Sequence, residues 1–216
     1  MKKEVTFSIL LVAALLVVIL IDRKVEMNKA KEFGANKTMT KQTAMTITSS
    51  DFKESEYIPA RFTCDGENIH PSLEFNAVPD DAVSIALIVE DPDVSKEFKP
   101  DGLWDHWIVF DIPKGTTKIS AGETVEGTYG KNSKGDAAYG GPCPPDKTHR
   151  YFFRLYALDN KLGLPAGATK KEVMTAMTGH ILKQSSLIGM YNRTPPTPEP
   201  TSGESTGADV VKTPTL

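Results

Sequence analysis

The chain has 216 residues, which is enough for one domain with a well-buried core and terminal extensions. Its formal net charge is -3, from 25 Lys and Arg residues against 28 Asp and Glu residues. Nucleic-acid binding depends on clustered Lys and Arg side chains that face phosphates. The charge balance therefore argues against a nucleic-acid partner.

An uncharged, almost wholly aliphatic segment runs from Val5 to Ile21, after two N-terminal lysines. It lies near the short end of the roughly 17–25 residues of a spanning helix and exceeds the roughly 7–15 residues of a signal-peptide core. We interpret residues 1–21 as a membrane anchor or a cleaved signal segment, with a buried soluble helix as a third alternative. The anchor is favoured, because no Ala-x-Ala-like cleavage site follows directly.

The charges around this segment bear on its orientation. Basic residues near the ends of a membrane helix favour the cytoplasmic side, and here the larger number follows the segment, which mildly opposes export. Short N-terminal tails with two lysines are nevertheless usual in exported proteins. We expect the protein to be membrane-anchored or secreted, with its domain on the extracytoplasmic side.

The composition divides the rest of the chain into three parts. Residues 22–44 are rich in Lys, Glu, Asn and Thr and resemble a flexible tether. Residues 45–193 have ordinary globular composition and form the predicted domain. Residues 194–216 are rich in Pro, Thr, Ser and Glu, and cannot bury enough apolar surface to offset the entropy of ordering, so we expect a disordered tail.

Within the domain, short segments bounded by Pro, Gly, Asp or Asn predict a mainly β fold. The predicted strands are Ala44–Ser50, Ser72–Phe75, Val83–Glu90, Trp107–Asp111 and Tyr151–Leu158. The third and fifth are apolar, or nearly so, on both alternating faces, which predicts central strands of a sheet covered on both sides.

A helix is predicted near the C-terminal end of the domain, from about Thr169 to Met177. Thr169 can cap it, and Glu172 follows at the capping-box spacing. The apolar pair Ile181-Leu182 allows the helix to continue past Gly179. The β domain should therefore end with one or two helices.

Polar groups stand at the ends of two predicted strands. Pro92 should end a strand and hold Asp91 and Asp93 on a turn, although an ordinary β-turn explains the same pattern. Strand alternation would place His106 on the opposite face from Asp105 and Trp107. His106 is interpreted either as a ligand-binding group or as a structural histidine with satisfied hydrogen bonds.

A third polar segment runs from Gly140 through Pro145 to His149-Arg150-Tyr151. Its glycines permit close backbone approach and its prolines make the loop rigid, although both could simply separate two strands. Together, the three segments predict a small anion-binding pocket. The spacing of the histidines and aspartates fits no metal-binding motif, and we expect no metal ion and no cofactor.

In order and spacing, these motifs resemble the phosphatidylethanolamine-binding protein family. The pattern is Asp-Pro-Asp, then Trp-x-His-aromatic, then Gly-Gly-Pro-x-Pro-Pro followed by His-Arg-Tyr. The chain is most similar to the bacterial and archaeal Raf-kinase-inhibitor-like branch, over about Thr46 to Arg193. The resemblance implies a large antiparallel sheet packed with a smaller sheet and C-terminal helices.

The resemblance also implies a small cavity that accepts phosphate, acetate or a phosphoryl head group. His106 and backbone N–H groups would donate to the anion, while Asp91 would orient an imidazole or accept from an ammonium group. Asp105 stands where animal members have another histidine, so phospholipid binding is not assumed. The implied ligand-binding residues are Asp91, Pro92, His106, Gly141, Pro144, His149 and Tyr151.

Cys64 and Cys143 are the two cysteines of the chain, and the resemblance places both at the same end of the sheet. They would form a disulfide if their Cα atoms lie within about 7 Å. An exported domain would favour the disulfide, whereas a cytosolic one would keep the thiols reduced.

We expect a non-enzymatic binding protein for a small anionic or phosphorylated ligand. It would act as an inhibitor or scaffold with a protein partner such as a kinase or protease, and would reach the membrane through its N-terminal helix. The alternative is a hydrolase that uses His106 or His149 as a base and Asp91 as its orienting group. It lacks a recognisable nucleophile, so no catalytic residue is assigned. An envelope protein with a purely structural role is the third reading.

Overall fold

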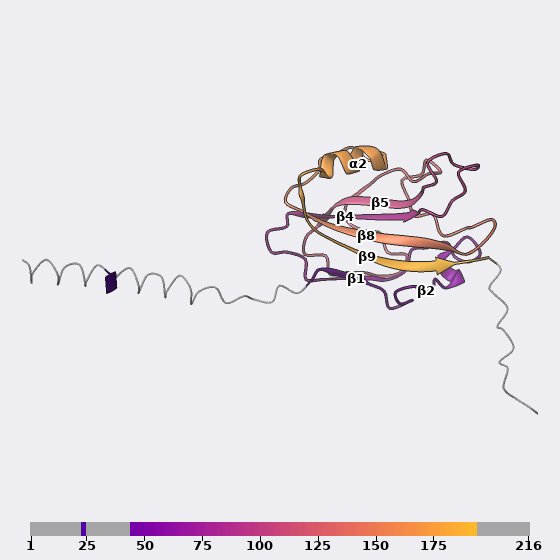
Figure 1. Ribbon diagram of the computed structural model, residues 1–216, viewed down its shortest axis with the longest axis horizontal. Helices are drawn as coiled ribbons and strands as arrows, with labels where there is room; N and C mark the ends of the chain where they lie inside the picture. The colour runs from indigo at the N-terminus through magenta and orange to yellow at the C-terminus, as the bar shows by residue number, and fades with distance from the viewer. Residues whose placement is uncertain (1–22, 25–43, 194–216) are drawn as a thin grey trace, which may run out of the picture. The chain divides into compact units, whose positions relative to one another are not determined.

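The computed structural model describes residues 23–24 and 44–193. The predicted anchor or signal segment, most of the predicted tether and the predicted tail lie outside these residues. Within the described ranges, no helix has the length and apolar character needed to cross a membrane. Residues 44–193 fall in one compact unit, which Figure 1 shows as a β-rich domain.

Two sheets form the domain, as the family resemblance implies. In the larger sheet, neighbouring strands pair antiparallel except β2 with β9. Its strand order is β2 (Glu56–Tyr57), β9 (Ile181–Tyr191), β8 (His149–Leu158), β4 (Ser84–Asp91), β5 (Trp104–Pro113) and β7 (Thr128–Tyr129). The smaller sheet consists of β1 (Thr46–Thr48), β3 (Leu73–Asn76) and β6 (Lys118–Ile119).

The centre of the large sheet is buried on both faces. All eight residues of β4 are buried, as its apolar sequence predicts. One face of the sheet packs against the small sheet, where Val89 belongs to the same apolar cluster as Phe75. The other packs against α2 (Lys170–Met177), where Ile88 joins Val173. Figure 1 accordingly shows β1 and α2 on opposite sides of the large sheet.

Helix α2 begins as the sequence predicts and ends earlier than its longest predicted form. Thr169 and Glu172 form the expected capping box. Gly179 has a φ of 83°, in the left-handed region that favours glycine, and there the chain reverses. The predicted continuation of the helix past Gly179 is wrong, because Ile181 starts β9, and the described domain therefore ends with a strand and not with a helix. That strand pairs with β8 along its length, with Tyr191 opposite His149.

A β-bulge alters the expected alternation around His106. Val89 pairs with Trp107 and Glu90 pairs with Asp105, so β5 carries one residue more than β4 at this point. The His106 ring contacts Tyr151 on the same side of the sheet as Trp107, with 5.1 Å between ring centroids. Asp105 lies on the other side, 3.2 Å from the Lys170 amine. The bulge therefore turns His106 toward the small-sheet side, which simple alternation from Trp107 would not do.

Candidate functional site

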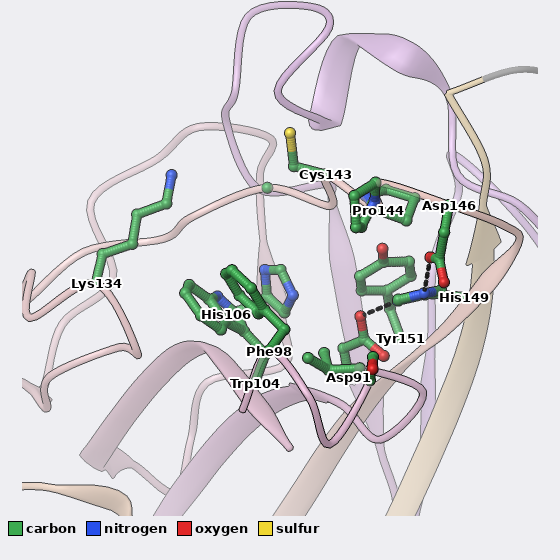
Figure 2. Close-up of a pocket in the computed structure, with 14 residues that line it drawn as sticks. Asp91, Phe98, Trp104, His106, Lys134, Cys143, Pro144, Asp146, His149 and Tyr151 are labelled. Atoms are coloured by element: carbon green, nitrogen blue, oxygen red, sulfur yellow. Dashed lines mark hydrogen bonds and ion pairs between the residues drawn. The ribbon is translucent and has the colours of Figure 1, made fainter. Parts of the chain in front are cut away.

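A cavity of about 350 Å³ opens at one end of the central strands (Figure 2). Because β4 runs antiparallel to both β5 and β8, the end of β4 lies beside the beginnings of those two strands. Loops 92–103 and 130–148 complete the walls. The lining residues are Asp91, Val94, Ser95, Phe98, Trp104, His106, Lys134, Gly141, Cys143, Pro144, Pro145, Asp146, His149 and Tyr151.

Six of the seven predicted ligand-binding residues line this cavity, and Pro92 does not. Pro92 is exposed, and it follows the last residue of β4, where its missing N–H ends the strand pairing. Its neighbour Asp93 forms an ion pair with Arg150 instead. The Asp-Pro-Asp motif therefore supplies one cavity residue, Asp91, and the other two residues shape the strand end.

His149 lies between two carboxylates. Its Nδ1 is 2.7 Å from Asp91 Oδ2, and its Nε2 is 2.9 Å from Asp146 Oδ1 (Figure 2). The other Asp91 oxygen accepts from the Asp93 N–H at 2.8 Å. Burial raises the pKa of Asp91 despite these hydrogen bonds. Both ring nitrogens of His149 are thus committed within the protein, which fixes the orientation of the ring.

His106 has a defined tautomer. Its Nδ1 lies 2.6 Å from the Gly140 carbonyl oxygen, which can only accept, so Nδ1 carries the proton. Burial lowers the pKa of His106 to about 4, so the ring is neutral near pH 7. The remaining nitrogen, Nε2, is then an acceptor. In this neutral form Nε2 would accept from a ligand, and the predicted donation by His106 to an anion would require a second ring proton.

Tyr151 supplies a hydroxyl group to the cavity floor. Its side chain is fully buried, and its ring meets His106 edge to face. The hydroxyl has no hydrogen-bond partner among the described residues. Burial, together with the negative charge of Asp91, raises the pKa of Tyr151. The hydroxyl therefore keeps its proton and can donate a hydrogen bond.

The cavity wall at Gly141 packs closely against the segment from Phe62 to Asn68. The Gly141 N–H donates to Asn68 Oδ1 at 2.7 Å, so this amide is already committed. A Cβ atom at Gly141 would stand 2.7 Å from the Phe62 carbonyl oxygen, closer than real Cβ contacts allow. The absence of a side chain therefore permits the wall to approach the segment around Phe62.

A disulfide joins Cys64 to Cys143, with 5.5 Å between their Cα atoms. The Cys64 N–H also donates to the Pro142 carbonyl at 3.1 Å. Because Cys143 lines the cavity, the disulfide ties the wall to the segment that follows the 3-10 helix η1 (Ala60–Phe62).

Several lining residues were not predicted from the sequence. Phe98 is 71% exposed and lies against Trp104 at the mouth of the cavity, with 5.8 Å between ring centroids. Lys134 is the one Lys or Arg among the described lining residues. Asp146, three residues before His149, is the only one with a short-range signal in the sequence. Across residues 23–24 and 44–193, no group of three or more His, Cys, Asp or Glu side chains is placed to hold a metal ion.

The fold and site define a two-sheet β domain whose described part contains one α-helix and one short 3-10 helix, and whose cavity lies at the ends of its central strands. The family model described as phosphatidylethanolamine-binding protein matches residues 48–192. The chain therefore belongs to the phosphatidylethanolamine-binding protein family.

Individual relatives agree with this assignment. The UPF0098 protein of Methanothermobacter thermautotrophicus is 46% identical over 155 residues, covering 69% of this chain and 99% of the relative. A solved structure from Chlamydia trachomatis, described as a homologue of phosphatidylethanolamine-binding protein, is 42% identical with a TM-score of 0.69, covering 70% of this chain and 99% of that one. Escherichia coli YbcL, described as a member of the mammalian family, is 27% identical with a TM-score of 0.64, covering 70% of this chain and all of that one.

Proposed function

We propose that this chain is a binding protein whose cavity holds the phosphoryl or carboxylate group of a small molecule. The observation that carries the proposal is the Tyr151 hydroxyl, which is fully buried and unpartnered among the described residues. Leaving such a group unsatisfied costs about 1–3 kcal/mol, which a ligand oxygen would relieve. Lys134 supplies a positive charge at the rim.

The arrangement of the histidines favours binding over hydrolysis. His149 has both ring nitrogens bonded to carboxylates, and neutral His106, with a pKa of about 4, is a weak base. Ser95 also lines the cavity, but its hydroxyl accepts from the Glu97 N–H and forms no bond to either histidine. Cys143 is bound in the disulfide. A hydrolase would need a nucleophile activated by an adjacent base.

We place the domain on the extracytoplasmic side of a membrane, anchored or released. Support comes from the disulfide, because such bonds persist in oxidising compartments and are rare in the cytosol. The aliphatic segment before residue 22 agrees with export. Alkylation of the thiols in intact cells, before lysis, would test the placement, since free cysteines would oppose it.

The binding proposal is tested by calorimetric titration of the full-length chain with phosphate, phosphoethanolamine and acetate. Tyr151→Phe removes only the hydroxyl, and we expect it to weaken binding about 2- to 10-fold, as the loss of one hydrogen bond would. Tyr156→Phe is the matched control, because Tyr156 is also buried but belongs to the cluster beneath α2. The proposal fails if the wild type shows no saturable binding, or if both variants bind equally well.

A further inference from the structure

Building on the proposed function, we propose that the cavity binds a phosphate monoester as its protonated monoanion, with the P–O–H group donating to His106 Nε2. It would discriminate against the dianion, and against phosphodiesters, which have no such proton.

The direction of the hydrogen bond between His106 and Gly140 determines which ring nitrogen faces the ligand as an acceptor. The Gly140 carbonyl oxygen has no proton to give, so the 2.6 Å contact fixes the imidazole proton on Nδ1. Because burial lowers the pKa of His106 and keeps the ring neutral, Nε2 then carries a lone pair. A bare phosphoryl oxygen facing this atom would place two acceptors together, whereas a P–O–H group would form a hydrogen bond. His106 therefore favours a ligand that brings its own proton.

Other donors are few on this side of the cavity. The Gly141 N–H donates to Asn68, and the two prolines that line the wall have no N–H. Both nitrogens of His149 are committed to carboxylates. The Tyr151 hydroxyl and the N–H of Cys143 remain in these segments, and the Ser95 hydroxyl and the Lys134 ammonium can donate from the two loops. A dianion would use these donors but would find none at His106 Nε2, where a P–O–H group would be satisfied.

The charge around His106 limits the charge that the ligand can carry. From β4 it is faced by Asp91, and from β8 by His149 and Tyr151. The loop between β7 and β8 adds Asp146 and Lys134. The carboxylate of Asp91, about as buried as His106, would repel a second negative charge on the ligand. The lining thus carries two carboxylates and one lysine, so a ligand with a single negative charge meets less repulsion than one with two.

The experiment compares three ligands that differ in their protons. Methyl phosphate is a monoester, methylphosphonate has a higher second pKa, and dimethyl phosphate is an anion without a P–O–H group. The affinity of the full-length wild type for each is measured by calorimetry between pH 5 and pH 8. A phosphate monoester has its second pKa near 6, so we expect its affinity to fall about tenfold per pH unit above that value.

The decisive result is whether the pH midpoint, at which the affinity begins to fall, depends on the second pKa of the ligand. We expect the midpoint for methylphosphonate to lie higher by the difference between the two ligand pKa values, and dimethyl phosphate to bind at least tenfold more weakly than methyl phosphate at pH 5. A midpoint that is the same for both ligands would assign the titration to the protein and overturn the inference, while leaving the proposed function intact. If none of the three ligands binds, the inference fails, and the proposed function fails with it if acetate does not bind either.

Lys134→Gln separates charge from proton donation. Lys134 is exposed, so the substitution leaves the buried floor unchanged. We expect weaker binding of every anion with the same pH midpoint; a shifted midpoint would count against His106 as the proton acceptor. Glycerol 3-phosphate and a short-chain phosphatidic acid, which carry the same monoester group, then distinguish a soluble ligand from a lipid one by which binds more tightly.

Discussion

Loss of the Cys64–Cys143 disulfide should destabilise the domain measurably. The two cysteines are 79 residues apart, so the bond closes a long loop in the unfolded chain. For a loop of about 80 residues, the chain-entropy relation gives roughly 4.5 kcal/mol at 25 °C, and measured values usually lie near 2–4 kcal/mol. For a domain of about 150 residues, each kcal/mol corresponds to about 2–4 °C. We therefore expect the Tm to fall by roughly 5–15 °C.

The assay is thermal unfolding followed by circular dichroism, on oxidised protein, on reduced protein and on the double variant Cys64→Ser/Cys143→Ser. Free thiols are counted by mass spectrometry after alkylation. We expect the reduced protein and the double variant to unfold at similar temperatures. The double variant is also the control for the reductant, because its unfolding curve should not respond to it.

Coincident unfolding curves for oxidised protein and fully reduced protein would refute this reasoning. They would mean that the unfolded chain is already compact enough for the bond to restrict it little. A fall in Tm only in the double variant would point to the serine side chains instead of the missing bond.

Two further substitutions test the cavity wall and the charges beneath α2. Gly141→Ala should lower the Tm by several degrees and weaken ligand binding, because its Cβ would meet the Phe62 carbonyl; Gly115→Ala, with nothing within 4 Å, is the control, and equal effects of the two would contradict the close approach. Burial opposes ionisation of Glu90, but hydrogen bonds from Lys170 and Arg154 outweigh it and lower its pKa. This stability is present above the ordinary pKa of 4.5 and is lost as the pH falls through the lower folded-state value. Glu90→Gln should therefore cost about 2 kcal/mol at pH 7, as the loss of hydrogen bonds to a charged group does, and flatten the acid side of the stability curve; an unchanged curve would show that the two ion pairs of Glu90 contribute nothing.

The central strands and the start of the helix could be predicted because their signals are local. Strand β4 is an unbroken apolar run, and the capping box at Thr169 lies within four residues. Strand β9 has no such signal, since the residues from Lys183 to Ser186 are polar and largely exposed. Its extended form comes from pairing with β8. A short apolar pair after a helix could not reveal this.

The site shows the same division between local and distant causes. Asp91, His149 and Tyr151 were identifiable from motifs at strand ends. The tautomer of His106 depends on a carbonyl 34 residues away in the sequence. The side of the sheet on which its ring lies depends on a bulge in the pairing of β4 with β5. Lys134 reaches the cavity from a loop with no distinctive pattern. Such features arise from tertiary contacts, which one sequence does not record.

The placement of the cavity also bears on how the family can diverge. The floor residues Asp91, His106, His149 and Tyr151 belong to three adjacent, fully paired strands, where a substitution disturbs the core. The mouth belongs to two loops, where insertions and replacements are tolerated. Under the proposed function, evolution can therefore alter the size and shape of the ligand through residues such as Phe98, while the recognition of its polar group by the floor residues stays the same. Descendants of one such protein would differ in which molecules they bind far more than in how they bind them.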